Sequence, residues 1–301
     1  MSLSTGPIFI TGATGQLGGL IIEEILKPVE NPGRTPLAAP SDLLALVRSP
    51  DKPAARALEE KGVTLRRGDY SDPAALREAM TGARTVMLIS GTDIGQRVQQ
   101  HKHVIDAAHA AGAERIVYTS VIVAGKSPEP IFHDHKETED YIKASGLQYT
   151  MLRNSFYMDA YVSEIKLAIE RGYYQAGGPS GGSLVSRRDI ARMAAAVLAT
   201  AGHAGKTYGL TGEVVCTAEE FARIATAIGG KPVEARVVAM DEIEKDYVER
   251  GYPADHMPFY LLLEKQVSSG LLEEVTSDIQ DVTGAAPMSF EDFSRAELSA
   301  G

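Results

Sequence analysis

Three glycines at a spacing of three residues stand near the start of the chain, in the segment Gly12-Ala13-Thr14-Gly15-Gln16-Leu17-Gly18. They follow a short apolar run and open a stretch with helical spacing of leucine and isoleucine. Glycine permits a tight turn and a close backbone approach, and a helix N-terminus attracts anions. The order of strand, turn and helix strengthens what is otherwise a weak motif. We therefore expect a pyrophosphate site formed by the following residues: Gly12, Ala13, Thr14, Gly15, Gln16 and Leu17, with Gly18 letting the helix pack close to the strand.

A basic residue, Arg48, follows the next apolar run, residues 43–47. Sites that bind NAD usually place an acidic residue near this point, where it contacts the ribose 2′-hydroxyl. A guanidinium instead suits a 2′-phosphate, because it can form two parallel, charge-assisted hydrogen bonds. Arg48 therefore favours NADP(H) over NAD, the alternative being an ordinary solvated surface arginine.

Two further polar turns follow later apolar runs. Asp69, in Gly68-Asp69-Tyr70, is expected to border the adenine, although a plain turn is an equal alternative. Ser90, Gly91 and Thr92 form a small polar turn whose backbone can pass close to the nicotinamide ribose. Open α/β sheets bind ligands at the carboxyl ends of their strands, where all these residues are expected to lie.

The first half of the chain alternates apolar runs with amphipathic stretches. The expected strands are residues 7–11, 43–47, 63–65, 85–90, 115–119 and 149–152, and the expected helices are 16–27, 53–61, 72–80, 93–111 and 134–144. This rhythm is typical of βαβ units and a parallel sheet. It predicts an α/β fold with a Rossmann-type, doubly wound parallel sheet.

The second half is less regular, and predicts a smaller, mainly helical C-terminal lobe. Its expected helices are residues 188–199, 218–228, 241–250 and 258–267, with weak strands at 207–210 and 233–238. We expect an NADP-binding domain at 7–155 and a substrate-binding lobe at 156–301 that share part of one core. Residues 28–41 carry four prolines, Pro28, Pro32, Pro36 and Pro40, and are expected to form an extended surface loop without helix.

Composition excludes several classes of protein. The 301 residues include 44% hydrophobic and 23% charged residues, with a formal charge of −10, which disfavours a nucleic-acid binder. No apolar run reaches the ~18 residues of a membrane span, and the start of the chain lacks the pattern of a signal peptide. Cys216 is the only cysteine, so the chain has no intrachain disulfide or cysteine-based zinc site. We expect a cytoplasmic protein without a metal site that acts on a small molecule, and the sequence leaves homo-oligomer formation open.

The motifs together resemble a known family, the NmrA-like group of atypical short-chain dehydrogenase/reductases. Within it, the chain is most similar to the NADPH-dependent quinone oxidoreductase and triphenylmethane-dye reductase types. The resemblance runs from about residue 7 to beyond 215, and residues 28–41 look like an insertion. It rests on the following stretches: Thr11 to Gly18, Leu46-Val47-Arg48, Gly68-Asp69-Tyr70, Ile94-Gly95-Gln96-Arg97, Gln100-His101, Val104-Ile105, Tyr118-Thr119-Ser120, Glu137-Thr138-Glu139 and Leu152-Arg153-Asn154.

The resemblance implies a catalytic group of Ser, Tyr and Lys, in which the tyrosine transfers the proton. Ser120 and Lys136 match the serine and the lysine, as catalytic residues. Phe132 stands where the tyrosine is expected, and a phenyl ring has no proton to give. His133 and His135 lie nearby and can titrate near neutrality, or they are exposed histidines without a catalytic role.

Two functions are consistent with the missing acid. The first is an NADPH-dependent oxidoreductase that transfers a hydride to a quinone or a similar electrophilic aromatic acceptor, which needs no strong protein acid. The alternative is a non-catalytic NADP(H)-sensing regulator that acts through protein partners, with residues 28–41 as a partner surface or as an ordinary loop. A sugar-nucleotide epimerase is disfavoured because it needs the tyrosine and lysine pair.

The resemblance also implies residues on the nicotinamide and substrate side. Asn154 is expected to contact the cofactor, while Phe156 and Tyr157 are expected to contact the substrate. Flat aromatic walls suit a quinone ring, although a core-packing cluster is the alternative. The glycine-rich segment at 177–182 is expected to be flexible, and residues 181–186 are expected to form a mobile lid.

Overall fold

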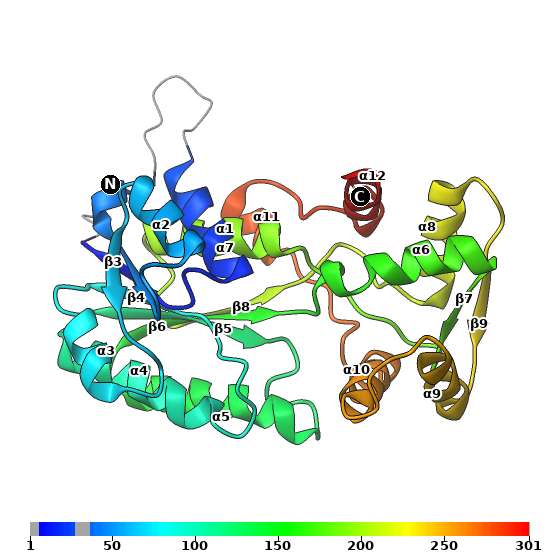
Figure 1. Cartoon of the computed structure of the whole chain (residues 1–301), viewed down its shortest axis with the longest axis horizontal. Helices are drawn as coiled ribbons and strands as arrows, with labels where there is room; N and C mark the ends of the chain where they lie inside the picture. Colours follow the sequence, from blue (N-terminus) through cyan, green and yellow to red (C-terminus); the bar gives the residue numbers. More distant parts are fainter. Residues whose placement is uncertain (1–5, 28–36, 301) are drawn as a thin grey trace. The chain divides into compact units, whose positions relative to one another are not determined.

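The computed structural model of the chain describes residues 6–27 and 37–300 (Figure 1). The chain forms two compact units, and it passes between them more than once. The first unit contains Met1–Asn154, Arg187–Gly209 and Asp281–Gly284. The second unit contains Ser155–Ser186, Leu210–Gln280 and Ala285–Gly301.

Seven strands of the described chain form one sheet in the first unit, in the order β3-β2-β1-β4-β5-β6-β8. The strands are β1 (Ile8–Ile10), β2 (Leu43–Val47), β3 (Thr64–Arg67), β4 (Thr85–Leu88), β5 (Arg115–Val121), β6 (Gln148–Asn154) and β8 (Lys206–Leu210). Neighbouring strands from β3 to β6 pair in parallel, with Phe9 of β1 opposite Leu44 and Val86. Every residue of β1, β2 and β4 is buried, as expected for strands covered by helices on both faces.

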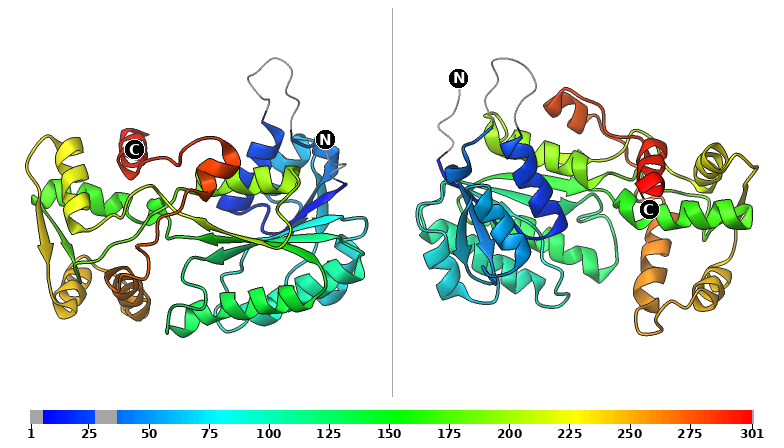
Figure 2. Two further views of the ribbon diagram at one scale, coloured as in Figure 1. Left: turned by 180° about the vertical axis from the view of Figure 1, so that it is seen from behind. Right: turned by 45° about the horizontal axis from the view of Figure 1, so that its top comes forward.

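Helices cover both faces of this sheet (Figures 1 and 2). On one face lie α1 (Gln16–Leu26), α2 (Pro53–Glu60) and α7 (Arg187–Ala199), and on the other lie α3 (Pro73–Ala79), α4 (Arg97–Ala110) and α5 (Pro130–Ala144). Pro53, Pro73 and Pro130 each occupy a first helical position, where the missing N–H has no intrahelical partner to lose. The predicted doubly wound α/β fold is confirmed.

Some predicted element bounds are wrong in ways that affect the site. The helix expected at 93–111 begins at Arg97, because residues 93–96 form a turn in which Gly95 has φ +83°. The helix expected at 134–144 begins at Pro130, so Lys136 lies in its second turn. β5 extends to Val121 and β6 to Asn154, so Ser120 lies on a strand and not after it.

The first unit also includes two elements that were expected in the second lobe. β8 joins the sheet beside β6, and α7 packs on α1. Ala191, Ala194 and Ala195 are buried in α7, and such small side chains let two helices approach closely. The predicted boundary at 155/156 lies one residue from the first break between the units, but Arg187–Gly209 and Asp281–Gly284 return to the first unit.

Arg115, at the start of β5, helps to fix the C-terminal end of α7. Its guanidinium donates to the carbonyl oxygens of Leu198 at 2.8 Å and Val197 at 3.2 Å. The last carbonyls of a helix have no partner within the helix, and a cation beside them is favourable. This contact between distant parts of the sequence holds α7 in the first unit.

Most of the predicted proline-rich loop, residues 28–36, lies outside the described residues. In the described remainder, the backbone N–H of Leu37 donates to the carbonyl of Ile25 at 3.1 Å. The prediction that this segment contains no helix is wrong for Pro40, which begins a 3₁₀ turn, η1 (Pro40–Asp42). The fixed φ of proline suits the first position of such a turn.

The second unit is mainly helical, as predicted, with a small sheet in which β7 (Tyr173–Ala176) and β9 (Glu234–Val237) pair in parallel. Its other elements are η2 (Met158–Ala160), α6 (Val162–Arg171), α8 (Ala218–Gly229), α9 (Met240–Glu249), α10 (Met257–Ser268) and α12 (Phe290–Ala300), while α11 (Asp278–Thr283) begins in it. Phe221 forms the centre of its core, stacked on Tyr174 at 4.3 Å and edge-to-face with Phe290 at 5.3 Å. Among the described residues, no helix is both long and apolar enough to cross a membrane.

A pair of substitutions in α1 tests the glycine turn. A Cβ atom on Gly18 would lie 2.2 Å from the carbonyl oxygen of Gly12, whereas one on Gly19 would have no atom within 4 Å. We expect Gly18→Ala to lower the free energy of unfolding by about 2 kcal/mol or more through this overlap. Gly19→Ala, the matched control, should raise it by up to about 1 kcal/mol through helix propensity. Urea unfolding of both variants measures the difference, and equal effects would contradict the packing argument.

Candidate nucleotide-binding and active site

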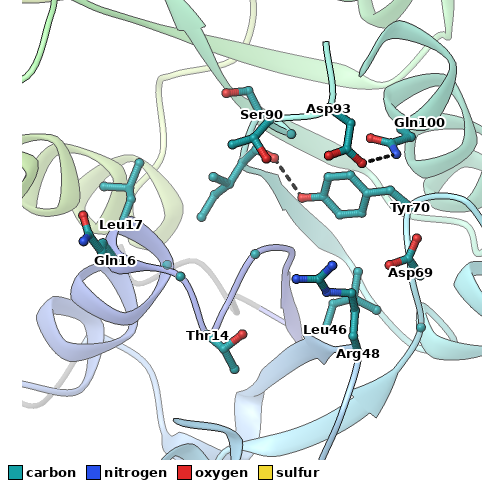
Figure 3. A pocket seen from close by; sticks show the side chains of 17 residues that line it. Thr14, Gln16, Leu17, Leu46, Arg48, Asp69, Tyr70, Ser90, Asp93 and Gln100 are labelled. Carbon is teal, nitrogen blue, oxygen red and sulfur yellow. Dashed lines mark hydrogen bonds between the residues drawn. The ribbon is translucent and has the colours of Figure 1, made fainter. Parts of the chain in front are cut away.

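A cleft of about 420 Å³ opens at the carboxyl ends of β1, β2, β3 and β4 (Figure 3). This is the edge at which an open α/β sheet binds its ligand. Its lining residues are Gly12, Thr14, Gly15, Gln16, Leu17, Gly18, Leu46, Arg48, Gly68, Asp69, Tyr70, Ile89, Ser90, Gly91, Thr92, Asp93 and Gln100. The structure therefore brings together ten of the twelve predicted cofactor residues.

The glycine turn supplies a wall made of backbone. Gly12 has φ +58°, a left-handed conformation that favours glycine, and its carbonyl accepts the N–H of Gly15 at 2.9 Å. Gly15 is the N-cap of α1 and has no side chain to occupy the helix end. The first N–H groups of α1 thus face the cleft without intrahelical partners, which suits an anionic ligand. The arrangement fits the pyrophosphate of a dinucleotide.

Arg48 extends from the end of β2 into the space between the glycine turn and Asp69 (Figure 3). Its side chain is exposed, and it forms no ion pair with any other residue of 6–27 and 37–300. A guanidinium that no protein carboxylate neutralises is available for an anionic group of the ligand. The residues of the cleft therefore fit NADP(H).

The segments that follow β3 and β4 form one wall of the cleft, and hydrogen bonds tie them together. The hydroxyl of Tyr70 donates to the carbonyl of Ile89 at 2.8 Å, and burial raises the pKa of Tyr70 above its ordinary value. The side-chain amide of Gln100 donates to Asp93 at 2.8 Å (Figure 3). Asp69 accepts the N–H of Ser71, which shapes the turn after β3. These bonds fix the wall before any ligand is bound.

Ala13 and Asn154 do not line this cleft. Ala13 is part of the glycine turn but is fully buried. Asn154 is buried at the end of β6, paired with Val121, and its carbonyl accepts the N–H of Ile122 at 2.9 Å. Cofactor contacts by these two residues remain predictions.

Ser120 belongs to a buried network of charged groups. Its hydroxyl donates to the carboxylate of Glu139 at 2.7 Å, and Arg153 binds the same carboxylate through two hydrogen bonds of 2.8 and 2.7 Å. Glu139 is fully buried, so the guanidinium provides the charge partner that its carboxylate needs. Ser120 thus offers its lone pairs and not its proton to any further group.

Lys136 lies on α5 with its ammonium at the surface. It forms an ion pair with Asp140, one turn further along, at 2.5 Å, and its side chain is 42% exposed. Its aliphatic stem passes Gly125, where a Cβ would lie 3.3 Å from it. Phe132, four residues earlier, is buried. The catalytic roles of Ser120 and Lys136 remain predictions.

The two histidines named beside Phe132 differ from each other. His133 is exposed on α5. His135 accepts or donates a hydrogen bond with the hydroxyl of Tyr118 at 2.9 Å, and burial together with the charge of Arg97 lowers its pKa to about 3. The suggestion that His135 titrates near neutrality is therefore wrong, because the buried imidazole is held neutral.

Phe156 and Tyr157 belong to the second unit. The carbonyl of Phe156 accepts the N–H of Val185 at 2.9 Å, and Tyr157 forms a parallel bridge with Val185. Phe156 also packs against the hydrophobic core of this unit, whose members include Met158. Both side chains are half-buried, so substrate contact by them remains a prediction.

The segment at 181–186 does not have the structure expected of a mobile lid. Gly182 and Cys216 exchange two backbone hydrogen bonds of 2.9 and 3.3 Å, and the N–H of Ser183 donates to Leu272 at 2.9 Å. A Cβ on Gly181 would lie 2.3 Å from the carbonyl oxygen of Cys216. The glycines of this segment therefore serve close packing within the second unit, and not flexibility.

The sequence analysis did not predict several of the residues that line the cleft as cofactor contacts. They are Leu46, Gly68, Tyr70, Ile89, Asp93 and Gln100, of which Gly68 and Tyr70 were named only as the neighbours of Asp69 in its turn. Leu46 and Ile89 carry no chemical signal, because they look like ordinary strand residues. Gln100 did carry one, since a polar residue on the buried face of a predicted helix needs a partner.

The fold and the cleft define a dinucleotide-binding α/β protein. A model of the NmrA-like family matches residues 4–292, and the chain belongs to that family. The resemblance drawn from the motifs is therefore confirmed.

Several of the similar proteins are named as oxidoreductases or reductases. The chain is 42% identical over 228 residues to quinone oxidoreductase 2 of Escherichia coli (strain K12), covering 75% of this chain and 76% of that protein. Its fold matches that of the NADPH-dependent quinone oxidoreductase of Escherichia coli complexed with NADPH, with a TM-score of 0.86 and 33% identity over 97% of this chain and 99% of that one. It also matches the triphenylmethane reductase of Citrobacter sp., with a TM-score of 0.87 and 32% identity over 97% and 99%.

Removing the guanidinium of Arg48 tests its contact with the 2′-phosphate. We expect Arg48→Ala to raise the KM for NADPH by roughly tenfold or more, the value of a charge-assisted hydrogen bond, and to leave the KM for NADH nearly unchanged. Arg56→Ala is the matched control, because Arg56 is an exposed arginine on α2 that lines neither this cleft nor the pocket that Arg48 shares with β3. Steady-state kinetics with both cofactors measures the effect. Equal losses for NADPH and NADH would refute the role.

The neutral histidines predict how stability depends on pH. The pKa of His101 and of His135 falls to about 3 in the folded protein, against an ordinary 6.5. Below pH 6.5 the unfolded chain binds protons that the folded chain does not, so each histidine removes about 1.4 kcal/mol of stability per pH unit as the pH falls. Denaturant unfolding between pH 6 and 4.5 measures the slope of the unfolding free energy against pH. In His135→Asn this slope should be smaller by the contribution of one proton, about 1.4 kcal/mol per pH unit. Tyr118→Phe, which loses the hydrogen bond but no titrating group, should keep the slope of the parent.

Proposed function

We propose that this NADPH-dependent reductase transfers a hydride to a quinone or to a similar electrophilic aromatic acceptor. The observation that carries the proposal is the cleft itself, in which the glycine turn and the exposed Arg48 meet at one edge of the sheet. The names of the similar proteins, which reduce quinones, triphenylmethane dyes or azo compounds, support an acceptor of this class.

Bound NADPH supplies the hydride, and the chain supplies the binding and orientation. The N-terminus of α1 and the backbone at Gly12 and Gly15 hold the pyrophosphate, and Arg48 holds the 2′-phosphate. The turn of Ser90, Gly91 and Thr92 would hold the nicotinamide ribose. Lys136 and Ser120 would complete this end of the site, and Lys136 would have to exchange its ion pair with Asp140 for the ribose.

The chemistry of the acceptor agrees with Phe132 in the place of an acid. A quinone that accepts a hydride becomes a hydroquinone anion, which takes its proton from water, so NADPH, quinone and one proton give NADP⁺ and hydroquinone. A cationic dye that accepts a hydride needs no proton at all. Neither reaction requires the proton that a tyrosine would donate. In the proposal, Phe156 and Tyr157 offer flat aromatic surface to such an acceptor.

Mixing the purified chain with NADPH and a panel of quinones and cationic dyes tests the proposal. We expect NADPH oxidation above the blank, with a primary isotope effect from deuterated NADPH and a solvent isotope effect near one. NADPH binding without oxidation of the cofactor by any acceptor would contradict the reductase and support the regulator that binds protein partners.

A substitution at Phe132 tests the reasoning about the acid. Phe132→Tyr adds the phenol that the chain lacks, and we expect less than a threefold change in kcat for a quinone, because the protein acid is not needed. Thermal unfolding of the variant checks that the buried hydroxyl leaves the fold intact. A tenfold or greater gain in kcat would show that proton transfer limits the reaction after all.

A further inference from the structure

Three polar side chains of α4 are buried on one face of the helix. Arg97, Gln100 and His101 are 8%, 7% and 0% exposed, and residues at such spacings lie next to one another on a helix. Burial of a polar group is unfavourable unless it forms hydrogen bonds. The partners of these side chains therefore indicate why a polar face is kept inside the first unit.

The shared partner is the peptide of Gly91, in the wall of the cleft. Nε of Arg97 donates to the carbonyl oxygen of Gly91 at 2.8 Å. Nε2 of His101 accepts the backbone N–H of the same residue at 2.9 Å. Two side chains one helical turn apart thus hold both polar groups of one residue. We call this arrangement of Arg97, His101 and Gly91 the Gly91 clamp.

The clamp fixes the tautomer of His101. Because Nε2 accepts a hydrogen bond, the proton is on Nδ1, which lies 2.9 Å from Oγ1 of Thr138 and donates to it. That hydroxyl in turn donates to the carbonyl of Asp134 at 2.8 Å. The histidine is therefore held from both sides, by the cleft wall and by α5. Burial and the charge of Arg97 lower its pKa to about 3, which keeps Nε2 an acceptor at neutral pH.

Arg97 is likewise fixed from more than one side. Its Nη1 donates to the carbonyl of Ile131 at 3.2 Å and lies 3.7 Å from the carboxylate of Asp134. The guanidinium therefore connects Gly91 to the first turn of α5. The neighbouring Gln100 donates to Asp93 at 2.8 Å and to Ser71 at 3.3 Å, which ties the same wall to the turn after β3.

Position 91 is a place where such support is needed. A Cβ there would lie 3.3 Å from Oε1 of Gln100 and 3.6 Å from the ring of Tyr70, so glycine is favoured by the tight space. Glycine also loses more conformational freedom on ordering than any other residue. A wall of the cleft that contained an unsupported glycine would have to be ordered when the ligand binds, at a cost in affinity.

We propose that Arg97 and His101 are positioning residues that hold the Gly91 peptide in its ligand-ready conformation and thereby set the affinity for NADPH. The inference rests on the proposed function, since it needs the turn of Ser90, Gly91 and Thr92 to contact the cofactor. Neither side chain itself lines the cleft, so both act through Gly91.

Binding of NADPH to the full-length chain tests the clamp without any acceptor. His101→Leu leaves the N–H of Gly91 without its acceptor, and we expect the Kd for NADPH to rise roughly tenfold. His101→Gln is the rescue variant, because its amide can present an oxygen near the place of Nε2 and should recover most of the affinity. Arg97→Lys keeps the positive charge but lacks the fork that reaches both Gly91 and Ile131, and should raise Kd by several-fold.

Tyr208→Phe is the control for general destabilisation. It removes a comparable tyrosine–histidine hydrogen bond, between the hydroxyl of Tyr208 and Nδ1 of His203 at 2.8 Å, on the edge strand β8, and Tyr208 does not line the cleft. We expect it to lower the melting temperature and to leave the Kd for NADPH within twofold of the parent value. Nucleotide fluorescence gives the Kd, and the melting temperature measured with and without NADPH gives an independent estimate. In turnover, the His101 variant should show a raised KM for NADPH with kcat changed less than threefold.

Two results overturn the clamp. One is an unchanged Kd in His101→Leu and in Arg97→Lys, and the other is an equal loss of affinity in Tyr208→Phe, which would mean that stability alone decides binding. The proposed function fails in a different way. In that case the parent chain would bind no NADPH, or it would bind NADPH but none of the acceptors tested would oxidise the cofactor.

Discussion

The contact between the carbonyl of Gly12 and the bare backbone of Gly18 is the constraint on which the rest of the first unit depends. Because no side chain separates them, α1 begins directly behind the turn and lies close against the sheet. α7 then packs on α1 through small residues, and Arg115 reaches across from β5 to the end of α7. One missing Cβ thus decides both the shape of the anion site and the position of a helix that is distant in sequence.

The face of the sheet that α3, α4 and α5 cover carries a cluster of ionisable side chains. Arg97, His101 and Tyr118 are buried there and His135 is half-buried, and desolvation together with the charge of Arg97 keeps both imidazoles neutral. Neutral imidazoles can accept hydrogen bonds, which protonated ones cannot. Hydrogen bonds from Arg97 and His101 to Gly91 therefore fix part of the backbone that lines the cleft. Arg48 remains an exposed cation of the cleft, in a chain whose formal charge is −10.

The sequence was informative where the signal is local. The apolar run at Leu43–Val47 and the glycine turn are short-range features, and the structure has them where they were expected. The placement of α7 and β8 depends on partners far along the chain, such as α1 and β6, which no local pattern records. The glycines at 181–186 were misread because glycine is equally common in flexible loops and at close backbone contacts, and only the tertiary partners distinguish the two. Gln100 and His101 were seen as motif residues, but their partners Asp93 and Gly91 come from a loop whose fold the sequence does not specify.

The path of the chain between the two units has a consequence for modular exchange. Residues 155–186 and 210–280 belong to the second unit but lie between segments of the nucleotide-binding unit, so no uninterrupted fragment of the polypeptide consists of the nucleotide-binding unit alone. A truncation after Asn154 would strip the sheet of its edge strand β8 and expose the surface of α1 that α7 covers. Grafting the second unit of a relative onto this scaffold therefore requires matched insertions at several junctions, and not a single crossover.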